Sequence, residues 1–264
     1  MTATVHLDRA GEAAWLTLDR PGRGNALVPE LLAALRARIA EARTAGARVL
    51  VVTGAGRAFS AGGDVGVFAA HASDTVALRA YAAEIVGELN AAVLDLLAFP
   101  APVLAAVNGP VTGGSAGLIL AADMVAMSDT AFLQPYYSEV GFAPDGGWTA
   151  LLPERIGSAR ALKALYLNER LSAHDCLKLG IADHVCEADR LGAVTGGQVA
   201  MILEKDAASL AVSRANVWSP ARRARLAAAL EREREGFLSL IARPETLERM
   251  QRFLAAVRPA EPAR

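Results

Sequence analysis

Two kinds of hydrophobic pattern alternate along most of the chain. Residues 47–54 and 101–108 are continuous apolar runs, which are typical of strands buried on both faces of a sheet. Residues 13–19 alternate weakly between apolar and polar positions and predict another strand. Apolar residues recur at helical spacing over 27–46 and 74–98, which predicts two long helices. This order of strands and helices indicates an α/β fold with crossover connections.

Local signals mark the starts of further elements. Asn25 precedes the first long helix and is expected to cap it, and another helix is expected to begin near Asp64 inside a glycine-rich loop. Residues 124–129 and 131–135 predict short strands. A further helix is expected to begin near Thr149.

The last part of the chain lacks any strand pattern. The apolar residues of 219–241 and 242–257 recur at the spacing of amphipathic helices. We therefore divide the chain into a core, residues 1–194, and a C-terminal helical region, residues 195–264. The helical region is expected to pack on this core or on another subunit.

Composition and charge exclude several classes of protein. Hydrophobic residues make up 53% of the chain and charged residues 21%, as in globular proteins. The net charge of −1 gives no electrostatic case for nucleic acid or an anionic membrane as a partner. No signal peptide is indicated, and glycines and polar residues interrupt the uncharged run 101–122, which argues against a membrane span. Two cysteines, Cys176 and Cys186, are too few for a disulfide framework or a zinc site, so we expect a cytoplasmic protein.

The stretch "GPVTGGSAGLIL", residues 109–120, has no acid, base or thiol, yet its glycines resemble those of an active-site loop. Residues 113–117 match the pattern G-x-S-x-G, in which Ser115 would be the nucleophile of a serine hydrolase. That mechanism would also need an acid, Asp145 or Asp175, and a histidine from "SAHDCLKLGIADH". Residues 109–112 separate the predicted strand from this pattern, whereas a nucleophile elbow joins strand and helix directly.

The alternative is that the backbone of these loops is the catalytic group. A helix that starts in "TGGSAG" leaves its first N–H groups unpaired, and glycines let a substrate oxygen approach them. A second glycine-rich loop, "FSAGGD", can direct another N–H at the same oxygen and so form an oxyanion hole. The acid or base would then be Asp145 of "APDGGW", with Glu139 as the rival carboxylate. A helix cap is the alternative role of Asp145.

Taken together, the motifs resemble those of the crotonase family, the enoyl-CoA hydratases and isomerases. The resemblance implies a spiral of ββα units, followed by a C-terminal helical region that assembles trimers or dimers of trimers. It also implies acyl-CoA thioesters as substrates and no nicotinamide, flavin or metal. The matching stretches occur in family order and are "LDRPGRGNAL", "VVTGAGRAFSAGGDV", "AAVNGPVTGGSAGL", "EVGFAPDGGWTALLPERIG" and "LKLGIADHV".

The resemblance also assigns roles to individual residues. The two N–H donors for the thioester oxygen fall on Gly63 and Gly114, and the proton-transferring carboxylate falls on Asp145. Ser115 then need not be reactive. The positions expected to bind the acyl-CoA are Ala26, Ala61, Asp64, Val65 and Tyr137.

Two positions depart from the hydratase pattern. Family hydratases use two glutamates to hold and activate water, and the corresponding positions here are Gly117 and Tyr137. "PDGG" instead resembles the isomerase-type members, which include ring-epoxide isomerases of phenylacetyl-CoA breakdown and some double-bond isomerases. We therefore expect an acyl-CoA isomerase that uses Asp145. A hydratase or hydrolase with an atypical acid or base, namely Asp145, Glu139 or Tyr137, and a non-catalytic acyl-CoA binder remain alternatives.

Overall fold

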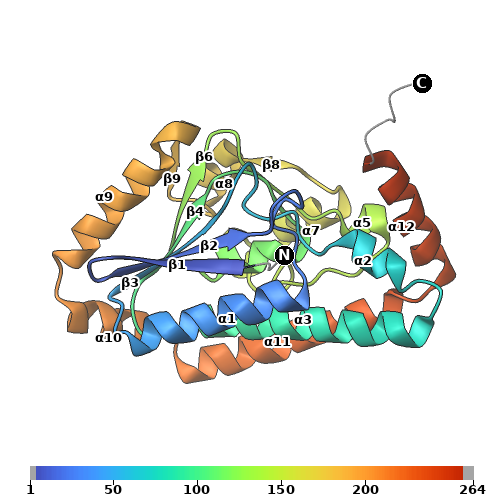
Figure 1. Cartoon of the computed structure of the whole chain (residues 1–264), viewed down its shortest axis with the longest axis horizontal. Coiled ribbons are helices and arrows are strands. Elements are labelled where there is room, and N and C mark those ends of the chain that lie inside the picture. Colours follow the sequence, from blue (N-terminus) through green and yellow to red (C-terminus); the bar gives the residue numbers. More distant parts are fainter. Residues whose placement is uncertain (1–3, 258–264) are drawn as a thin grey trace.

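A computed structural model of the chain describes residues 4–257 (Figure 1). Its larger sheet has six strands in the order β1-β2-β3-β4-β6-β9, and a smaller sheet has the order β5-β7-β8. In the larger sheet β1 and β2 form an antiparallel hairpin, and every later pairing is parallel. The strands are β1 (Thr4–Ala10), β2 (Ala13–Asp19), β3 (Val49–Gly54), β4 (Val103–Val107), β5 (Val111–Thr112), β6 (Met124–Ser128), β7 (Phe132–Gln134), β8 (Leu171–Ser172) and β9 (His184–Cys186).

Helices cover both faces of the larger sheet. On β3, Leu50 and Val52 join the main core, whereas Val49 and Val51 pack with Leu191 and its neighbours on the other face. The strand is apolar throughout because both of its faces are buried. The helices are α1 (Pro29–Thr44), α2 (Val65–Ala70), α3 (Thr75–Leu97), α4 (Ala116–Leu120), α5 (Tyr137–Val140), α6 (Leu152–Ile156), α7 (Ser158–Tyr166), α8 (Ala173–Leu179), α9 (Leu191–Leu203), α10 (Ala207–Val217), α11 (Pro220–Leu240) and α12 (Pro244–Val257), with 3₁₀ turns η1 (Gly113–Ser115) and η2 (Ala188–Arg190).

The C-terminal helices pack on the core of their own chain. Helix α11 lies along α3, which in turn lies beside α1, and α12 contacts α2 and α5 (Figure 1). Helix α9 runs across the expected boundary between residues 194 and 195. Packing of the tail on its own core is thus observed, and packing on another subunit stays a prediction.

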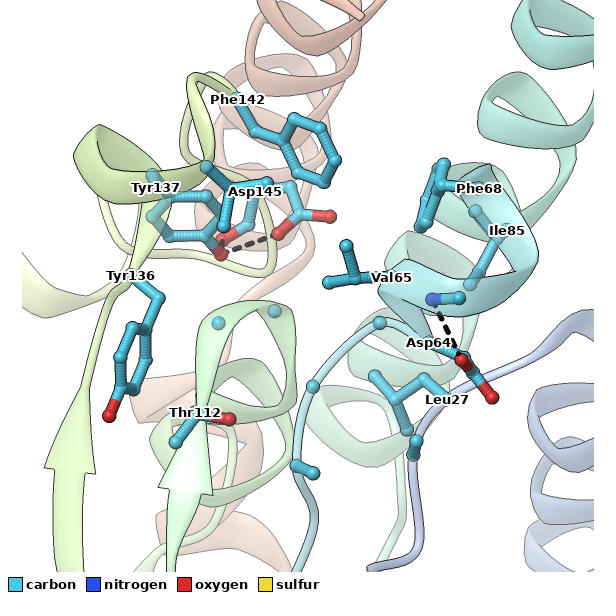
Figure 2. A pocket seen from close by; sticks show the side chains of 18 of the residues that line it. Leu27, Asp64, Val65, Phe68, Ile85, Thr112, Tyr136, Tyr137, Phe142 and Asp145 are labelled. Carbon is cyan, nitrogen blue, oxygen red and sulfur yellow. Dashed lines mark hydrogen bonds between the residues drawn. The ribbon is translucent and has the colours of Figure 1, made fainter. Parts of the chain in front are cut away.

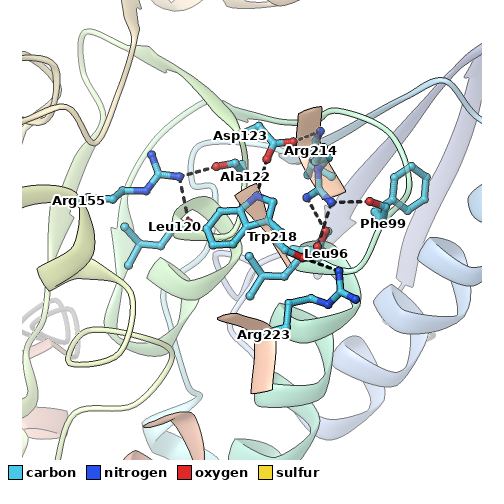
Figure 3. A network of polar contacts seen from close by, with 11 residues as sticks. Leu96, Phe99, Leu120, Ala122, Asp123, Arg155, Arg214, Trp218 and Arg223 are labelled. Carbon is cyan, nitrogen blue, oxygen red and sulfur yellow. Dashed lines mark hydrogen bonds and ion pairs between the residues drawn. The ribbon is translucent and has the colours of Figure 1, made fainter. Parts of the chain in front are cut away.

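A buried arginine attaches α10 to the core (Figure 3). Arg214 donates to the Asp123 carboxylate at 2.6 Å and to three carbonyl oxygens at the end of α3. Those carbonyls belong to Leu96, Leu97 and Phe99. Trp218 donates its indole N–H to the same carboxylate at 2.9 Å. Arg214 thereby adds donors to carbonyl groups at and just after the C-terminal end of α3, where the helix itself supplies few.

Most of the predicted elements are confirmed, but β1 and the short strands β5, β8 and β9 were not predicted, and two further details are wrong. β1 was not predicted, because it is an edge strand whose apolar positions are few. Asn25 does not cap α1, which starts at Pro29 after Val28; its amide instead accepts from the Arg20 N–H and donates to the Ala55 carbonyl. The helix expected near Thr149 begins at Leu152, after a turn. Within residues 4–257, no helix is both long and apolar enough to cross a membrane.

Candidate active site

The two glycine-rich loops of the sequence lie side by side. The Ser60 N–H donates to the Pro110 carbonyl, and the Thr112 N–H donates to the Ser60 carbonyl, both at 3.1 Å. A Cβ built on Gly62 would lie 2.5 Å from the Thr112 carbonyl oxygen, so only glycine allows this approach. These contacts hold the two loops side by side, so that both loops can contribute to one binding site.

Gly63 and Gly114 line the same cavity. Gly114 lies in η1, directly before α4, where the N–H groups of the first turn have no acceptor within the helix. Among residues 4–257, neither glycine N–H donates to another protein group. Both are therefore available to a ligand oxygen, as an oxyanion hole requires.

The cavity has a volume of about 550 Å³ and is apolar on one side (Figure 2). Ile85 and Leu89 of α3 contribute to it. Three phenyl rings gather beside them, with centroid distances of 5.4 Å for Phe68–Phe142 and 5.1 Å for Phe142–Phe237. This side of the cavity can hold an acyl group by burying its apolar surface.

The residues expected to bind the acyl-CoA all line this cavity: Ala26, Ala61, Asp64, Val65 and Tyr137. Asp64 also has a structural role, because its carboxylate caps α2 and binds Arg20 at 2.7 Å. Its charge is thus already paired. Within residues 4–257, no three His, Cys, Asp or Glu side chains are grouped as a metal site requires.

Asp145 is buried, 8% exposed, and lines the cavity near Gly114. The Tyr137 hydroxyl donates to its Oδ1 at 2.5 Å and contacts its backbone carbonyl oxygen at 3.0 Å. Figure 2 shows the second carboxylate oxygen turned away from Tyr137, toward the space between Phe142 and Val65. That oxygen is free to meet a substrate. A capping role for Asp145 is wrong, because no helix begins at the following residue.

The surroundings of Asp145 favour its protonated form. Burial raises the pKa of Asp145 to about 7; the Tyr137 hydrogen bond opposes this rise, and the nearby Glu233 carboxylate adds to it. Burial, followed by the Asp145 charge, holds the pKa of Tyr137 well above its usual value, so the phenol remains a donor. A carboxyl group with a pKa near neutrality can both take and return a proton.

Close packing leaves no room for side chains around Asp145. A Cβ on Gly114 would lie 2.7 Å from Asp145 Oδ1 and 2.7 Å from a Leu89 methyl carbon. A Cβ on Gly146 would lie 2.1 Å from the Gly114 carbonyl oxygen. Glycines therefore allow the Gly114 backbone and the Asp145 carboxylate to lie against each other.

Neither hydratase-type glutamate position could easily supply a carboxylate here. A Cβ on Gly117 would lie 2.6 Å from the Gly146 carbonyl oxygen, so the backbone already fills that space. Tyr137 occupies the second position and donates to Asp145. Glu139, the rival carboxylate, is exposed on α5 and does not line the cavity.

Ser115 does not have the surroundings of a nucleophile. It is fully buried, and its hydroxyl lies 2.7 Å from the Thr112 carbonyl oxygen and 3.1 Å from that of Ser60, which hold it as a donor. Asp175, one proposed acid, instead forms the capping box of α8 with Ser172. The serine-hydrolase interpretation is therefore not supported.

Comparison with known proteins places the chain in a family. The sequence model of the enoyl-CoA hydratase/isomerase family matches residues 9–260. The chain belongs to this family. It is 35% identical over 180 residues to a Rhodobacter capsulatus protein named probable enoyl-CoA hydratase, and the match covers 67% of this chain and 66% of the relative. It is 32% identical over 208 residues to trans-2-decenoyl-acyl-carrier-protein isomerase of Streptococcus mutans, covering 78% of each chain.

A solved structure extends the match to the whole fold. The crystal structure of an enoyl-CoA hydratase from Mycobacterium avium subsp. paratuberculosis covers all of both chains with a TM-score of 0.85 at 28% identity. The expected crotonase-type fold with its C-terminal helical region is confirmed. The names of the relatives include both hydratases and isomerases, so the family leaves the reaction open.

Several residues of the site were not predicted. Phe142 precedes Asp145 in the chain, whereas Phe237 and Phe253 reach the cavity from α11 and α12. Glu233 on α11 contacts the turn after Asp145. The sequence does carry one signal for Glu233: it stands in the apolar stripe of α11, between Leu230 and Phe237, where a charge is costly.

Proposed function

We propose that the protein is an acyl-CoA isomerase that uses Asp145 as its one general acid and base. The observation that carries this proposal is that Asp145 is the one carboxylate among the described residues that lines the cavity without a cationic partner, and it lies against Gly114. Asp64, the other carboxylate that lines the cavity, is bound by Arg20. Addition of water favours two carboxylates that share the water, whereas a proton shift needs only one.

In the proposed reaction the thioester oxygen accepts hydrogen bonds from the N–H groups of Gly63 and Gly114. The free oxygen of Asp145 removes a proton from one carbon of the acyl chain, and the electron pair moves into an enolate whose negative charge rests on the thioester oxygen. The same carboxyl group returns the proton to a carbon two bonds away, so that a double bond changes position. The reaction is balanced without a cofactor other than the CoA of the substrate. Oxyanion donors of this kind contribute ~10²–10³ each in rate.

A panel of 2-enoyl- and 3-enoyl-CoA thioesters tests the proposal. Isomerisation leaves the mass unchanged and alters the ultraviolet absorbance of the conjugated thioester, and in deuterated water we expect label in the product. Addition of water would assign a hydratase with an atypical site. Release of free CoA would assign a hydrolase, and binding without any turnover or exchange would assign a non-catalytic binder. Each of these three results overturns the isomerase proposal.

We also propose that the C-terminal helical region joins copies of the chain into a trimer or a dimer of trimers. Apolar side chains are exposed on α9 and α10: Met201 is 57%, Val212 60% and Val217 53% exposed. Contact between copies would remove such surface from water. Sedimentation at micromolar concentration should show a trimer or hexamer, and a stable monomer would contradict the assembly.

A further inference from the structure

Glu233 is a buried acid that binds the turn following Asp145. It is 5% exposed and belongs to α11. Its Oε2 accepts from the Gly147 N–H at 2.7 Å. Its Oε1 accepts from the N–H and the hydroxyl of Thr149, at 2.7 and 2.6 Å, and from the Ala150 N–H at 2.9 Å. One carboxylate thus satisfies four donors of a single turn.

This pattern favours the ionised form of Glu233. Both of its carboxylate oxygens accept from backbone N–H groups, which can only donate, so a proton on either oxygen would compete with them. Burial raises the pKa of Glu233 above its usual value, and the hydrogen bonds from Thr149 and the backbone limit this rise. The donors thus favour a negative charge beneath the active-site turn.

The turn that Glu233 holds is also part of the reactive arrangement. The turn follows Asp145 directly in the chain, and Gly146, which joins the two, packs on Gly114. Trp148, in the middle of the turn, donates its indole N–H to the Gly113 carbonyl at 2.8 Å. Any movement of the turn would therefore move both the carboxylate and the oxyanion loop.

We propose that Glu233 is a positioning residue, which holds the 147–150 turn so that Asp145 and the Gly114 N–H face the same substrate atoms. The inference rests on the proposed role of Asp145 and adds that α11, far along the chain, determines its geometry. Phe237, one helical turn after Glu233, lines the cavity, so the same helix shapes the acyl side of the site. Positioning and acyl binding are thereby coupled through α11.

Glu233 also influences the protonation of Asp145. Among residues 4–257, the titratable groups that face Asp145 are Tyr137 from α5 and Glu233 from α11, and η1 and α3 present Gly114 and Leu89. The negative charge of Glu233 raises the pKa of Asp145, and the Tyr137 hydrogen bond lowers it. Removal of the charge at residue 233 should therefore lower the pKa of Asp145.

The decisive variant is Glu233→Gln. Its amide oxygen can still accept from Thr149 and Ala150, but its NH₂ group would face the Gly147 N–H, and the charge is lost. We expect kcat to fall by ~10-fold to ~10²-fold with little change in KM, because the turn is displaced while the binding residues stay in place. The acidic limb of the pH profile of kcat/KM should move to lower pH.

Two further variants separate the effects of turn position and of the charge at residue 233 from a general loss of protein stability. Glu233→Asp keeps the charge but is too short for all four bonds, so kcat should fall while the acidic limb remains near its wild-type position. It also keeps the test possible if the Gln variant does not fold. The matched control is Asn90→Ala, which removes another buried bond to α11, the one to the Leu230 carbonyl at 3.0 Å. This control should lose stability and keep the wild-type pH profile.

A measurement without turnover distinguishes this inference from the proposed function. Titration of ¹³C-labelled aspartate carboxyl groups by NMR, assigned with Asp145→Asn, gives the pKa of Asp145 directly. It should be lower in Glu233→Gln than in the wild type. An unchanged pKa together with a wild-type kcat would overturn the role of Glu233. Full activity of Asp145→Asn would instead overturn the proposed function and leave the NMR result for Glu233 intact.

Discussion

Two carboxylates near the C-terminal helices have opposite surroundings. Asp123 accepts from Arg214 at 2.6 Å, from Trp218 at 2.9 Å and from the Val103 N–H at 2.8 Å, so a cation and two neutral donors stabilise its charge (Figure 3).

Asp145 has no cation as a partner among the described residues. The Tyr137 hydroxyl donates to it (Figure 2), and the carboxylate of Glu233 on α11 accepts from the Gly147 N–H, two residues further along the turn. The pKa of Asp145 rises accordingly.

The comparison shows how one region of the chain supplies both stability and reactivity. α10 brings Arg214 to Asp123 and thereby holds the tail on α3. α11 brings Glu233 near Asp145, which costs stability but keeps the proton on that carboxyl group exchangeable near neutral pH. A cation thus holds the carboxylate of Asp123, whereas the anion near Asp145 favours the protonated form of that carboxyl group.

The largest effect is expected for Asp145→Asn. The amide cannot take up a proton at neutral pH, so isomerisation should fall by ~10²–10⁴. Stability near neutral pH should be unchanged or higher, because folding raises the pKa of Asp145 and its ionised form therefore destabilises the fold. Steady-state kinetics and urea unfolding measure the two quantities. Wild-type label exchange from deuterated water in this variant would contradict the assignment.

The second prediction concerns Arg214→Met, which removes the donor that Arg214 supplies to Asp123 and to the three carbonyl groups. We expect unfolding to become easier by about 2–3 kcal/mol, because carbonyl groups of the buried residues Leu97 and Phe99 lose a hydrogen-bond donor. Specific activity per folded molecule should stay close to that of the wild type. If activity were lost while the urea midpoint stayed unchanged, the division between structural and functional carboxylates would be wrong.

Tyr137→Phe should change the pH profile more than the maximal rate. The Tyr137 hydrogen bond lowers the pKa of Asp145, so its removal raises that pKa further. Asp145 acts as a base only when it is deprotonated, and the acidic limb should therefore move to higher pH. At about pH 6 the rate should fall by ~10-fold, and the deficit should shrink as the pH rises. A shift of the limb to lower pH would show that Tyr137 acts in another way.

The smallest effect is expected for Ser115→Ala. Loss of its hydrogen bonds to the Thr112 and Ser60 carbonyls should cost about 1 kcal/mol of stability. Activity should remain within about threefold of the wild type, because Ser115 has no part in the proposed proton shift. A fluorophosphonate probe should leave the serine unmodified. Labelling of Ser115, with loss of activity in the variant, would restore the serine-hydrolase interpretation.

The local sequence determined much of the frame of this protein. The continuous apolar runs of β3 and β4 identified buried strands, and the spacing of apolar residues in α3 identified a helix that lines the cavity. These patterns depend on periodicity, which is a local property of the chain. The glycine loops and Asp145 were predicted as candidates from their local motifs and from the resemblance of these motifs to the crotonase family, and all of them line one cavity.

Only the tertiary structure decided how these residues work together. Glu233 is 88 residues (233 − 145) from Asp145 in the chain, and the turn that it holds lies between them in space. The same holds for Arg214, which lies 91 residues from Asp123. Periodicity cannot show which distant charge will lie beside a given carboxylate, because that depends on how helices dock. The pKa of Asp145 depends on the nearby charge of Glu233, and the hydrogen bonds of Asp123 depend on Arg214. The surroundings of the two acids were therefore decided by the packing of the helices.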